Sequence, residues 1–290
     1  MNNFVITTDS TVDLGRDRME ELGVKYVQLF YIRDGVAKRD NMTDQCALEI
    51  YDNMRNGVVY KSSQANPEDF VEIWTPMLEE GKDILYIGFS SGLSGVVNSG
   101  FLARGELGPK YPDRKIYIVD SLCASGGEGM FLEHVIAKKD EGATIEECRD
   151  YAEALKLRLN HWYTVSELSY LRRGGRVSAA AAVFADILNI KPVMDMNDEG
   201  KLIPREKAKG RKAAIRRMFD HLCERVDINE NPYFRITHAD CMDDALYLKK
   251  MIQDKFNGIP VYISYVGAVI GSHCGPGTLA MYFIGKPREN

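Results

Sequence analysis

A serine-rich loop in the first third of the chain has residue types that could do chemistry. Gly88–Gly92 (GFSSG) matches the pattern G-x-S-x-G, with a strand predicted before it and a helix after it. Hydrolases expose a nucleophilic serine in that context. Three interpretations stay open: a tight strand-to-helix turn, a nucleophile at Ser90, or a seat for a carboxylate or phosphate. Backbone N–H groups at a helix N-terminus attract anions, and Ser94 would add a donor.

Two other segments carry side chains that could complete such a site. Ser62 lies in Ser-Ser-Gln before a helix that starts at Pro67, where on its own it would serve as a helix cap. His273 lies between glycines in GSHCGPG, so the backbone can approach a ligand and the ring can point into a cleft. A purely structural histidine is the alternative. The other histidines show no H-x-x-x-H spacing, so we expect no metal site.

Two classes of enzyme can be weighed against these residues. A serine hydrolase would use Ser90 with His273 and an acid such as Asp240 or Asp243, and the chain order Ser, Asp, His fits. The H-G-G-G type of oxyanion loop is missing from the sequence. A phosphoryl-transfer enzyme acting alone is unsupported, because the chain has neither G-x-x-x-x-G-K-S/T nor G-x-G-x-x-G between a strand and a helix. We therefore expect no cofactor.

Charge is distributed unevenly along the chain. The sequence has 37 Lys+Arg and 42 Asp+Glu, a net charge of −5, yet Arg205–Arg217 contains seven basic residues and one glutamate. Aromatic residues are nearly absent from this tract, so nucleic acid is not an expected partner. The tract is either a solvated helix face or a docking surface for an acidic protein. The docking candidates are Arg172, Arg173, Arg205, Lys209 and Arg216.

The elements that must position these residues differ between the two halves. The first 160 residues alternate strand and helix candidates, which predicts an α/β domain with a doubly wound parallel sheet. Such sheets bind ligands at the carboxyl ends of their strands. Strands are expected over 4–8, 24–32, 84–89 and 115–119, and helices over 44–55, 67–80, to about 104 and to about 139. The loops at the carboxyl ends are Thr8–Ser10, Ser90–Gly95 and Asp120–Ser121.

The second half predicts a separate α+β domain, which divides the chain into residues 1–160 and 161–290. Its strands and helices do not alternate regularly, unlike those of the first half. We expect a loop over 172–176, an apolar helix over 178–189, helices over 206–225 and 243–256, and strands over 191–196, 201–204, 234–238, 261–266 and 279–285.

Composition is typical of a globular protein with a large core. The 290 residues are 45% hydrophobic and 27% charged. The most apolar stretch, Ala179–Ala185, ends at Asp186, well short of the ~20 residues that a membrane span needs. The start has neither the positive charge nor the apolar run of a signal peptide. The six cysteines form no C-x-x-C pair, which favours reduced thiols in the cytoplasm.

Seven short motifs together resemble the DegV family of bacterial fatty-acid-binding proteins. Each motif is weak alone, and their order along the chain is the signal. They are Thr8–Leu14 (TDSTVDL), Ser62–Gln64 (SSQ), Ser90–Gly95 (SSGLSG), Val119–Ser121 (VDS), Leu171–Arg176 (LRRGGR), Gly200–Leu202 (GKL) and Gly271–Thr278 (GSHCGPGT).

The resemblance implies two domains with a fatty acid in a tunnel between them. It also implies that a fatty acid kinase phosphorylates the bound carboxylate to an acyl phosphate. The chain itself would then be a lipid-binding subunit with no nucleotide site, not an enzyme, and we expect a monomer. The residues that the resemblance assigns to the carboxylate are Ser62, Ser94, His273 and Arg176, with Gly95 in the same loop as Ser94.

A fatty acid of this kind sets physical demands on the chain. A sixteen-carbon acid has about 14 methylenes, and burying them is worth on the order of 11 kcal/mol before the costs of binding. Only an enclosed apolar slot can provide that burial. The carboxylate needs several hydrogen bonds once it leaves water. Apolar residues available to line the slot are Ala179–Phe184, Ile187, Leu188 and Tyr282–Ile284.

Overall fold

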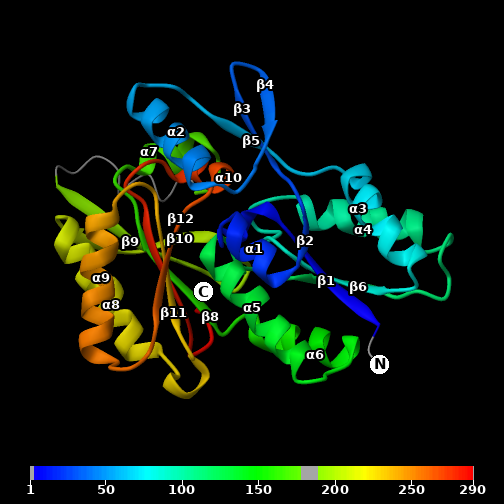
Figure 1. Cartoon of the computed structure of the whole chain (residues 1–290). Helices are drawn as coiled ribbons and strands as arrows, with labels where there is room; N and C mark the ends of the chain where they lie inside the picture. The colour runs from blue at the N-terminus through cyan, green and yellow to red at the C-terminus, as the bar shows by residue number, and fades with distance from the viewer. Residues whose placement is uncertain (1–2, 178–188, 290) are drawn as a thin grey trace.

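The computed structural model describes residues 3–177 and 189–289. Its first half contains the strands β1 (Phe4–Asp9), β2 (Lys25–Val27), β6 (Asp83–Gly88) and β7 (Ile116–Asp120), and the helices α1 (Arg16–Leu22), α2 (Asp44–Arg55), α3 (Pro67–Glu79), α4 (Val96–Leu107), α5 (Gly126–Asp140) and α6 (Ile145–Leu155). The four strands form a parallel sheet in the order β2-β1-β6-β7. In Figure 1, α3 and α4 lie on one side of this sheet and α5 and α6 on the other. The prediction of a parallel N-terminal sheet is confirmed.

Local signals explain the best-predicted part of this half. Pro67 starts α3, where its missing N–H leaves no bond unmade, and Asp69 Oδ2 accepts the N–H of Asn66 at 2.7 Å. Phe70 lies edge to face on Trp74 and on Tyr86 of β6, with ring centroids 5.0 and 5.1 Å apart. These fully buried rings fasten α3 to the sheet that carries the Ser90 loop.

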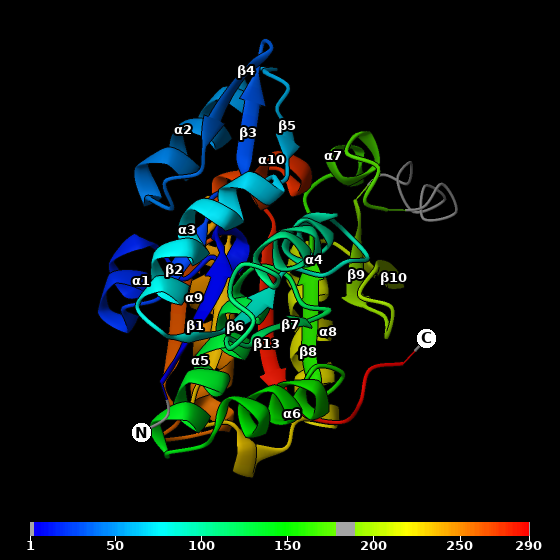
Figure 2. The same cartoon turned by 90° about the vertical axis from the view of Figure 1, so that its right-hand side faces the viewer.

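A small antiparallel sheet was not expected from the sequence. It consists of β3 (Phe30–Arg33), β4 (Val36–Arg39) and β5 (Lys61–Ser63), in the order β4-β3-β5. The β3–β4 hairpin projects at the top of Figure 2, and its turn at Asp34–Gly35 has positive φ at both residues, as a tight hairpin requires. The single strand predicted over 24–32 is wrong. The chain leaves the first sheet because the N–H of Leu29 donates to Ser10 Oγ at 3.0 Å and its carbonyl accepts from Asp40.

The second half is built on a mixed six-stranded sheet. Its elements are β8 (Leu159–Thr164), α7 (Leu168–Arg173), β9 (Ile190–Met196), β10 (Leu202–Lys209), α8 (Arg211–Arg225), β11 (Phe234–His238), α9 (Met242–Lys255), β12 (Val261–Tyr265), α10 (Ala268–Cys274) and β13 (Leu279–Ile284). The strand order is β10-β9-β8-β13-β11-β12, and only β11 and β12 run parallel. Helices α8 and α9 cover one face, on the left of Figure 1, and α5 packs against β8, β11 and β13.

The helix predicted over 206–225 starts later than expected. β10 runs to Lys209 and pairs with β9, with a register shift between Pro204 and Glu206. The helix α8 starts only at Arg211. A partner strand overrides the helical preference of this Lys- and Glu-rich segment, because pairing satisfies its backbone groups.

The loop predicted over 172–176 is helical at its start. Arg172 and Arg173 form the last turn of α7, which packs beside α10. The apolar helix predicted over 178–189 lies outside the described residues except for Asn189, which stands in a turn before β9.

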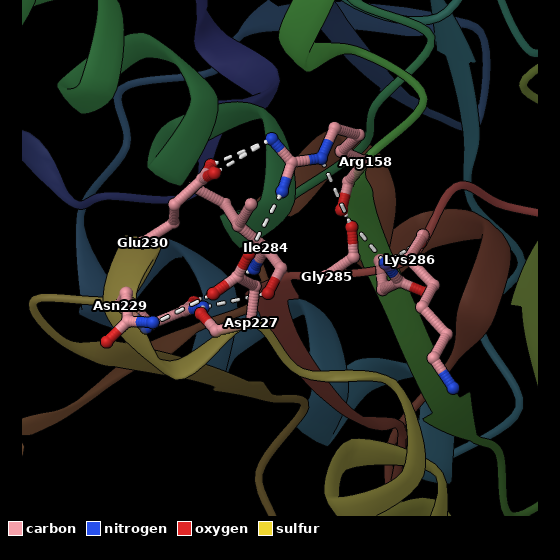
Figure 3. Close-up of polar contacts among 9 residues, drawn as sticks. Arg158, Asp227, Asn229, Glu230, Ile284, Gly285 and Lys286 are labelled. Carbon is pink, nitrogen blue, oxygen red and sulfur yellow. Dashed lines mark hydrogen bonds and ion pairs between the residues drawn. The ribbon is translucent and has the colours of Figure 1, made fainter.

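Arg158 lies directly before β8, close to the predicted domain boundary (Figure 3). Its Nη1 lies 3.0 and 2.9 Å from the two carboxylate oxygens of Glu230, and its Nη2 lies 3.5 Å from Asp227 Oδ2. Its Nε donates to the carbonyl of Gly285 at 3.4 Å. These bonds tie the start of β8 to the chain before β11 and after β13. The two large sheets share no strand, and a division at residue 160 stays a prediction.

Glycines at the start of α5 let the two halves pack closely. A Cβ at Gly127 would lie 2.2 Å from Nε2 of His161, and one at Gly126 would lie 2.6 Å from Cγ2 of Thr237. Both neighbours belong to the second sheet. Any side chain at these positions would push that sheet away from the first half.

Two buried carboxyl groups, those of Asp9 and Glu128, lie at the N-terminal end of α5. Thr11 Oγ1 lies 2.5 Å from Asp9 Oδ1 and 2.8 Å from Glu128 Oε2. A hydroxyl donates one hydrogen, so one of the two carboxyls must carry a proton of its own. Asp9 also accepts hydrogen bonds from Tyr86 and the N–H of Phe89, which favour its charged form. Burial, and next the charge of Asp9, raise the pKa of Glu128 well above its usual range. We infer that Glu128 is the protonated member.

Glu128→Gln is expected to make the protein more stable than wild type by an amount that grows with pH. The folded carboxyl keeps a proton that the unfolded chain releases above its usual pKa of 4.5. Wild-type stability is therefore lost as the pH rises from that value through the raised folded pKa, and a neutral amide removes this loss. Urea unfolding near pH 5 and near pH 8 measures the difference.

Glu133→Gln, on the same helix, is the matched control. The pKa of Glu133 is lowered although burial opposes this, because Arg235 and Tyr233 stabilise its charged form. Glu133→Gln should therefore cost stability near pH 8. A Glu128→Gln effect that is the same at both pH values would contradict the protonation of Glu128.

Candidate functional site

A cavity of about 400 Å³ lies between the loops of the first half and the second sheet. Its volume is in the range of small-molecule sites. Alternate residues of β8 and β13 form one wall: His161, Tyr163, Ala280 and Tyr282. Much of the rest is apolar and includes Leu29, Phe89, Leu93, Met196, Val269 and Ile270.

Four side chains assigned to a carboxylate by the motifs line this cavity. Ser62 comes from β5, Ser94 from the loop after β6, Arg176 from the chain after α7, and His273 from α10. They are far apart in the sequence and come together only in the fold. This part of the wall therefore combines two hydroxyls, an imidazole and a guanidinium.

Ser62 and His273 form one contact of the cluster. Ser62 Oγ lies 2.6 Å from His273 Nε2. A Cβ on Gly174 would lie 2.3 Å from His273 Nδ1, so the glycine lets the loop close over the ring. Burial, and next the positive charge of Arg176, lower the pKa of His273 to about 4. The imidazole is therefore neutral near pH 7 and can exchange one hydrogen bond with Ser62 or with a ligand.

Arg176 brings a permanent positive charge to the cavity. Its Nε donates to the carbonyl of Leu93 at 3.2 Å, and its Nη1 donates to the carbonyl of Gly174 at 2.5 Å. Its Nη2 donates to none of the described residues. A guanidinium held by two carbonyls keeps a fixed orientation and still has donors for a carboxylate.

Ser94 lies in a tight turn that ends where α4 starts. Its N–H donates to the carbonyl of Ser90 at 3.1 Å. Its Oγ accepts the N–H of Val96 at 3.3 Å. Because this hydroxyl is an acceptor toward the backbone, its own hydrogen remains available to a ligand oxygen.

Gly95 does not line the cavity. A Cβ at this position would lie 2.5 Å from Oε1 of Gln64, which does line it. The Nε2 of Gln64 donates to Ser99 Oγ on α4 at 3.1 Å. Gly95 therefore leaves space for the Gln64 side chain and contributes no side chain of its own.

The residues of the hydrolase alternative are not brought together. Ser90 is fully buried, its Oγ donates to the carbonyl of Gly200 at 2.7 Å, and it is absent from the cavity wall. His273 bonds Ser62 instead. Asp240 pairs with Arg55 on the surface, and Asp243 is exposed at the start of α9. The described residues thus form no Ser-His-Asp constellation around Ser90.

The strand β13 lines the cavity with only one of its two faces. Of the predicted Tyr282–Ile284, only Tyr282 belongs to the wall. Phe283 packs into the core under α8 and α9, because successive side chains of a strand point to opposite faces. The predicted lining residues 179–184, 187 and 188 lie outside the described residues. His161 and Tyr163 were missed, and their alternation with Trp162 in β8 was the available signal.

Lowering the pH from about 6.5 to about 4 is expected to cost stability through His273. An unfolded histidine binds a proton below its usual pKa of 6.5, whereas folded His273 does so only near 4. The stabilisation is complete above 6.5 and is lost as the pH falls through this window, by on the order of 3 kcal/mol at most. Urea unfolding of the delipidated protein at several pH values should show a shallower slope for His273→Gln. Identical slopes would contradict the burial of a neutral imidazole.

The basic tract is divided between two elements with different pairing. Arg205 on β10 forms an ion pair with Asp195, with Nε and Oδ1 3.0 Å apart, so its charge is partly compensated. Lys209 and Arg216 are exposed, as are Arg172 and Arg173 on α7. The part of the tract open to a partner is therefore smaller than the sequence suggests. The docking residues that stay exposed are Arg172, Arg173, Lys209 and Arg216.

Over residues 3–177 and 189–289, no helix combines the length and hydropathy needed to cross a bilayer. In the same part of the chain, no three His, Cys, Asp or Glu side chains gather in a way that could hold a metal ion.

Sheet order and cavity together define a class: an α/β protein with a parallel first sheet, a mixed second sheet and an apolar cavity that carries a cluster of polar donors. A family model described as "Uncharacterised protein, DegV family" matches residues 3–286. The chain belongs to the DegV family, and the resemblance drawn from the seven motifs is confirmed.

Known relatives and solved structures match this chain over nearly its whole length. A DegV domain-containing protein of Clostridium perfringens is 40% identical over 291 residues, covering 100% of both chains. A DegV family protein from Thermus thermophilus, described for its fatty acid binding, is 30% identical with a TM-score of 0.85, covering 98% of this chain and 100% of that one. The Fatty Acid Kinase (Fak) B3 protein of Streptococcus pneumoniae, loaded with linoleic acid, has a TM-score of 0.82 over 98% and 100% of the two chains. At 20% identity the last likeness shows the fold alone.

Proposed function

We propose that this chain binds a long-chain fatty acid in the cavity and presents the carboxylate to a fatty acid kinase for phosphorylation to an acyl phosphate. The cavity carries the proposal, because it combines an apolar wall with a cluster of Ser62, Ser94, His273 and Arg176. The fatty acid binding described for the Thermus thermophilus relative supports it. The kinase step is supported by the fold shared with the Streptococcus pneumoniae Fak B3 protein.

The electrostatics of the cluster suit a carboxylate that must remain reactive. Arg176 supplies one full positive charge, and neutral His273 and the two serines supply hydrogen bonds without adding charge. A carboxylate taken from water needs such donors to stay ionised. A modest positive field leaves its oxygens nucleophilic toward a phosphoryl donor. In this proposal the chain is a binding subunit, and the kinase supplies ATP and the catalytic groups.

Native mass spectrometry of the recombinant protein tests the first half of the proposal. We expect a bound species with the mass of a long-chain fatty acid, and its uptake again after delipidation. Ser94→Ala should weaken retention of the acid, since one hydrogen bond to a charged group is worth about 1.5–3 kcal/mol. Ser91→Ala is the matched control, because Ser91 is exposed in the same turn and absent from the wall. A clean apo mass with no uptake on titration would refute the proposal.

We further propose that the kinase docks on the exposed basic side chains of α7, β10 and α8. Reversing Arg172 and Arg173 to Glu, or Lys209 and Arg216 to Glu, is expected to lower acyl phosphate formation by tenfold or more at physiological salt. Fatty acid affinity should not change. The physical reason is that complementary charge mainly sets the rate of association and the choice of partner. A coupled assay with a fatty acid kinase and ATP, run beside a lipid-binding titration, measures both quantities.

Lys25→Glu is the control for a charge reversal outside the basic surface, because Lys25 is exposed on β2, the edge strand of the first sheet. It should leave acyl phosphate formation unchanged. Equal loss of lipid binding and phosphorylation in the double reversals would rule out a docking role for these residues.

A further inference from the structure

Arg288 buries a guanidinium whose hydrogen bonds go to backbone carbonyls. The residue follows β13, and only 7% of it is exposed. Its Nη1 donates to the carbonyls of Leu122 at 2.7 Å and Asn197 at 3.2 Å, and its Nη2 donates to the carbonyl of Lys156 and lies 3.7 Å from Cys123 Sγ. No acidic side chain among the described residues pairs with it. Burying a charge without a direct ion pair is costly, and here the carbonyls of three separate segments offset part of that cost.

Two of the three carbonyls that accept from Arg288, those of Leu122 and Asn197, belong to loops that also bond Ser90. Cys123, next to Leu122, accepts the N–H of Ser90 at 3.0 Å. Asn197 accepts the N–H of Gly200 at 3.0 Å, and Gly200 in turn accepts the Ser90 hydroxyl at 2.7 Å. Ser90 therefore bonds both loops that the guanidinium joins.

The Ser90 turn packs tightly against the backbone of residues 199–200. A Cβ on Gly200 would lie 2.1 Å from Ser90 Oγ, and one on Gly92 would lie 2.6 Å from the carbonyl of Glu199. The turn over 90–94 thus rests directly on the backbone of 199–200. A shift of that backbone would move the turn as well.

Ser90 in turn sets the position of the cavity donors. Its carbonyl accepts the N–H groups of Leu93 at 3.0 Å and Ser94 at 3.1 Å. The carbonyl of Leu93 accepts from Arg176 Nε at 3.2 Å. Hydrogen bonds joined by short backbone segments therefore connect Arg288, through Ser90, to the residues that carry the Ser94 hydroxyl and the Arg176 guanidinium.

We infer that Arg288 is a positioning residue for the carboxylate site. It acts through Ser90, whose hydrogen bonds connect the loops held by Arg288 to the turn that carries Ser94. The inference rests on the proposed fatty acid binding. Under this inference, the serine of the G-x-S-x-G segment holds neighbouring loops in place and is not a nucleophile.

The test uses the affinity of the delipidated full chain for a long-chain fatty acid and for the fatty alcohol of equal length. Arg288→Met is expected to weaken binding of the acid about tenfold and to leave the alcohol unchanged, so that acid-over-alcohol selectivity falls about tenfold. Millimolar guanidinium should restore the selectivity of Arg288→Ala, since the ion can occupy the vacated site. Lys286→Ala is the control, because Lys286 is an exposed basic residue in the same tail.

Hydrogen exchange supplies an independent readout. The amides of Leu93 and Ser94 should exchange faster in Arg288→Met than in wild type, and those of α8 should not. Should Arg288→Met fail to fold, Arg288→Lys carries the test. A lysine cannot reach Leu122, Asn197 and Lys156 together, so an intermediate loss of selectivity is expected.

The outcomes separate the inference from the function on which it rests. Wild-type selectivity in Arg288→Met or Arg288→Lys would overturn the positioning role, as would equal loss for the acid and the alcohol. A wild-type protein that binds neither ligand would overturn the proposed function itself, and the positioning role with it.

Discussion

Replacing Arg176 by methionine is expected to weaken binding of a long-chain fatty acid by about 100-fold. The substitution keeps most of the side-chain length and removes the positive charge that faces the cavity. Truncating one partner of a buried, hydrogen-bonded charge pair costs 2–5 kcal/mol, largely because the other charge is left unpaired. Isothermal titration of delipidated protein near pH 7 measures the loss.

The chemical specificity of this effect can be checked with a neutral ligand. A fatty alcohol of equal length should bind wild type and Arg176→Met with similar affinity, since it carries no charge to leave unpaired. Arg176→Lys should fall between the two, because an ammonium keeps the charge but not the planar fork that also holds Leu93. Arg172→Met is the matched control, since Arg172 is exposed on α7. An unchanged acid affinity in Arg176→Met would exclude the assigned carboxylate site.

Replacing Ala280 by phenylalanine is expected to block the acyl part of the cavity. Ala280 stands on β13 opposite Tyr163 of β8 and Thr237 of β11, and it belongs to the wall. A phenyl ring there would displace roughly four methylenes of a bound chain, worth about 3 kcal/mol or about 100-fold in affinity. A sixteen-carbon acid should lose this amount, whereas an eight-carbon acid should lose little.

Chain-length dependence distinguishes a filled cavity from a damaged protein. Ala280→Val should give a smaller loss in the same direction, because valine fills less of the space. The melting temperature of Ala280→Phe should stay near wild type, because the ring enters the cavity and so avoids the overpacking that would cost about 1–3 kcal/mol in a filled core. Equal losses for the long and short acids would show that Ala280 does not face the acyl chain.

Much of the family resemblance is readable from the chain because its signals are local. Motifs such as Gly271–Thr278 combine hydroxyls with glycines that a tight backbone requires, and they depend on neighbours only a few residues away. The hydrophobic runs and their regular alternation with helices likewise predicted that the first sheet is parallel, which the structure confirms. Local sequence patterns also predicted the observed bounds of α2 and β11.

Long-range pairing decided the features that the sequence did not show. The segment around Glu206 has helical composition, yet it lies in β10 because β9 satisfies its backbone groups. Arg205 carries the same charge as Arg216, yet Arg205 is paired with Asp195 and Arg216 is exposed. The pairing of β10 with β9 and the ion pair of Arg205 with Asp195 cannot be recognised from sequence distance alone.

The order of seven short motifs was enough to identify this chain as a DegV protein, and the resemblance pointed to Ser62, Ser94, His273 and Arg176, because such motifs depend on residue type and short-range spacing. The tertiary structure shows why Ser94 lines the cavity and Ser90 does not. Ser90 and Ser94 have the same chemistry, but the hydroxyl of Ser90 bonds Gly200, more than a hundred residues away, and that of Ser94 remains open to the cavity. The direction of a side chain is set by partners that only the folded chain brings within reach.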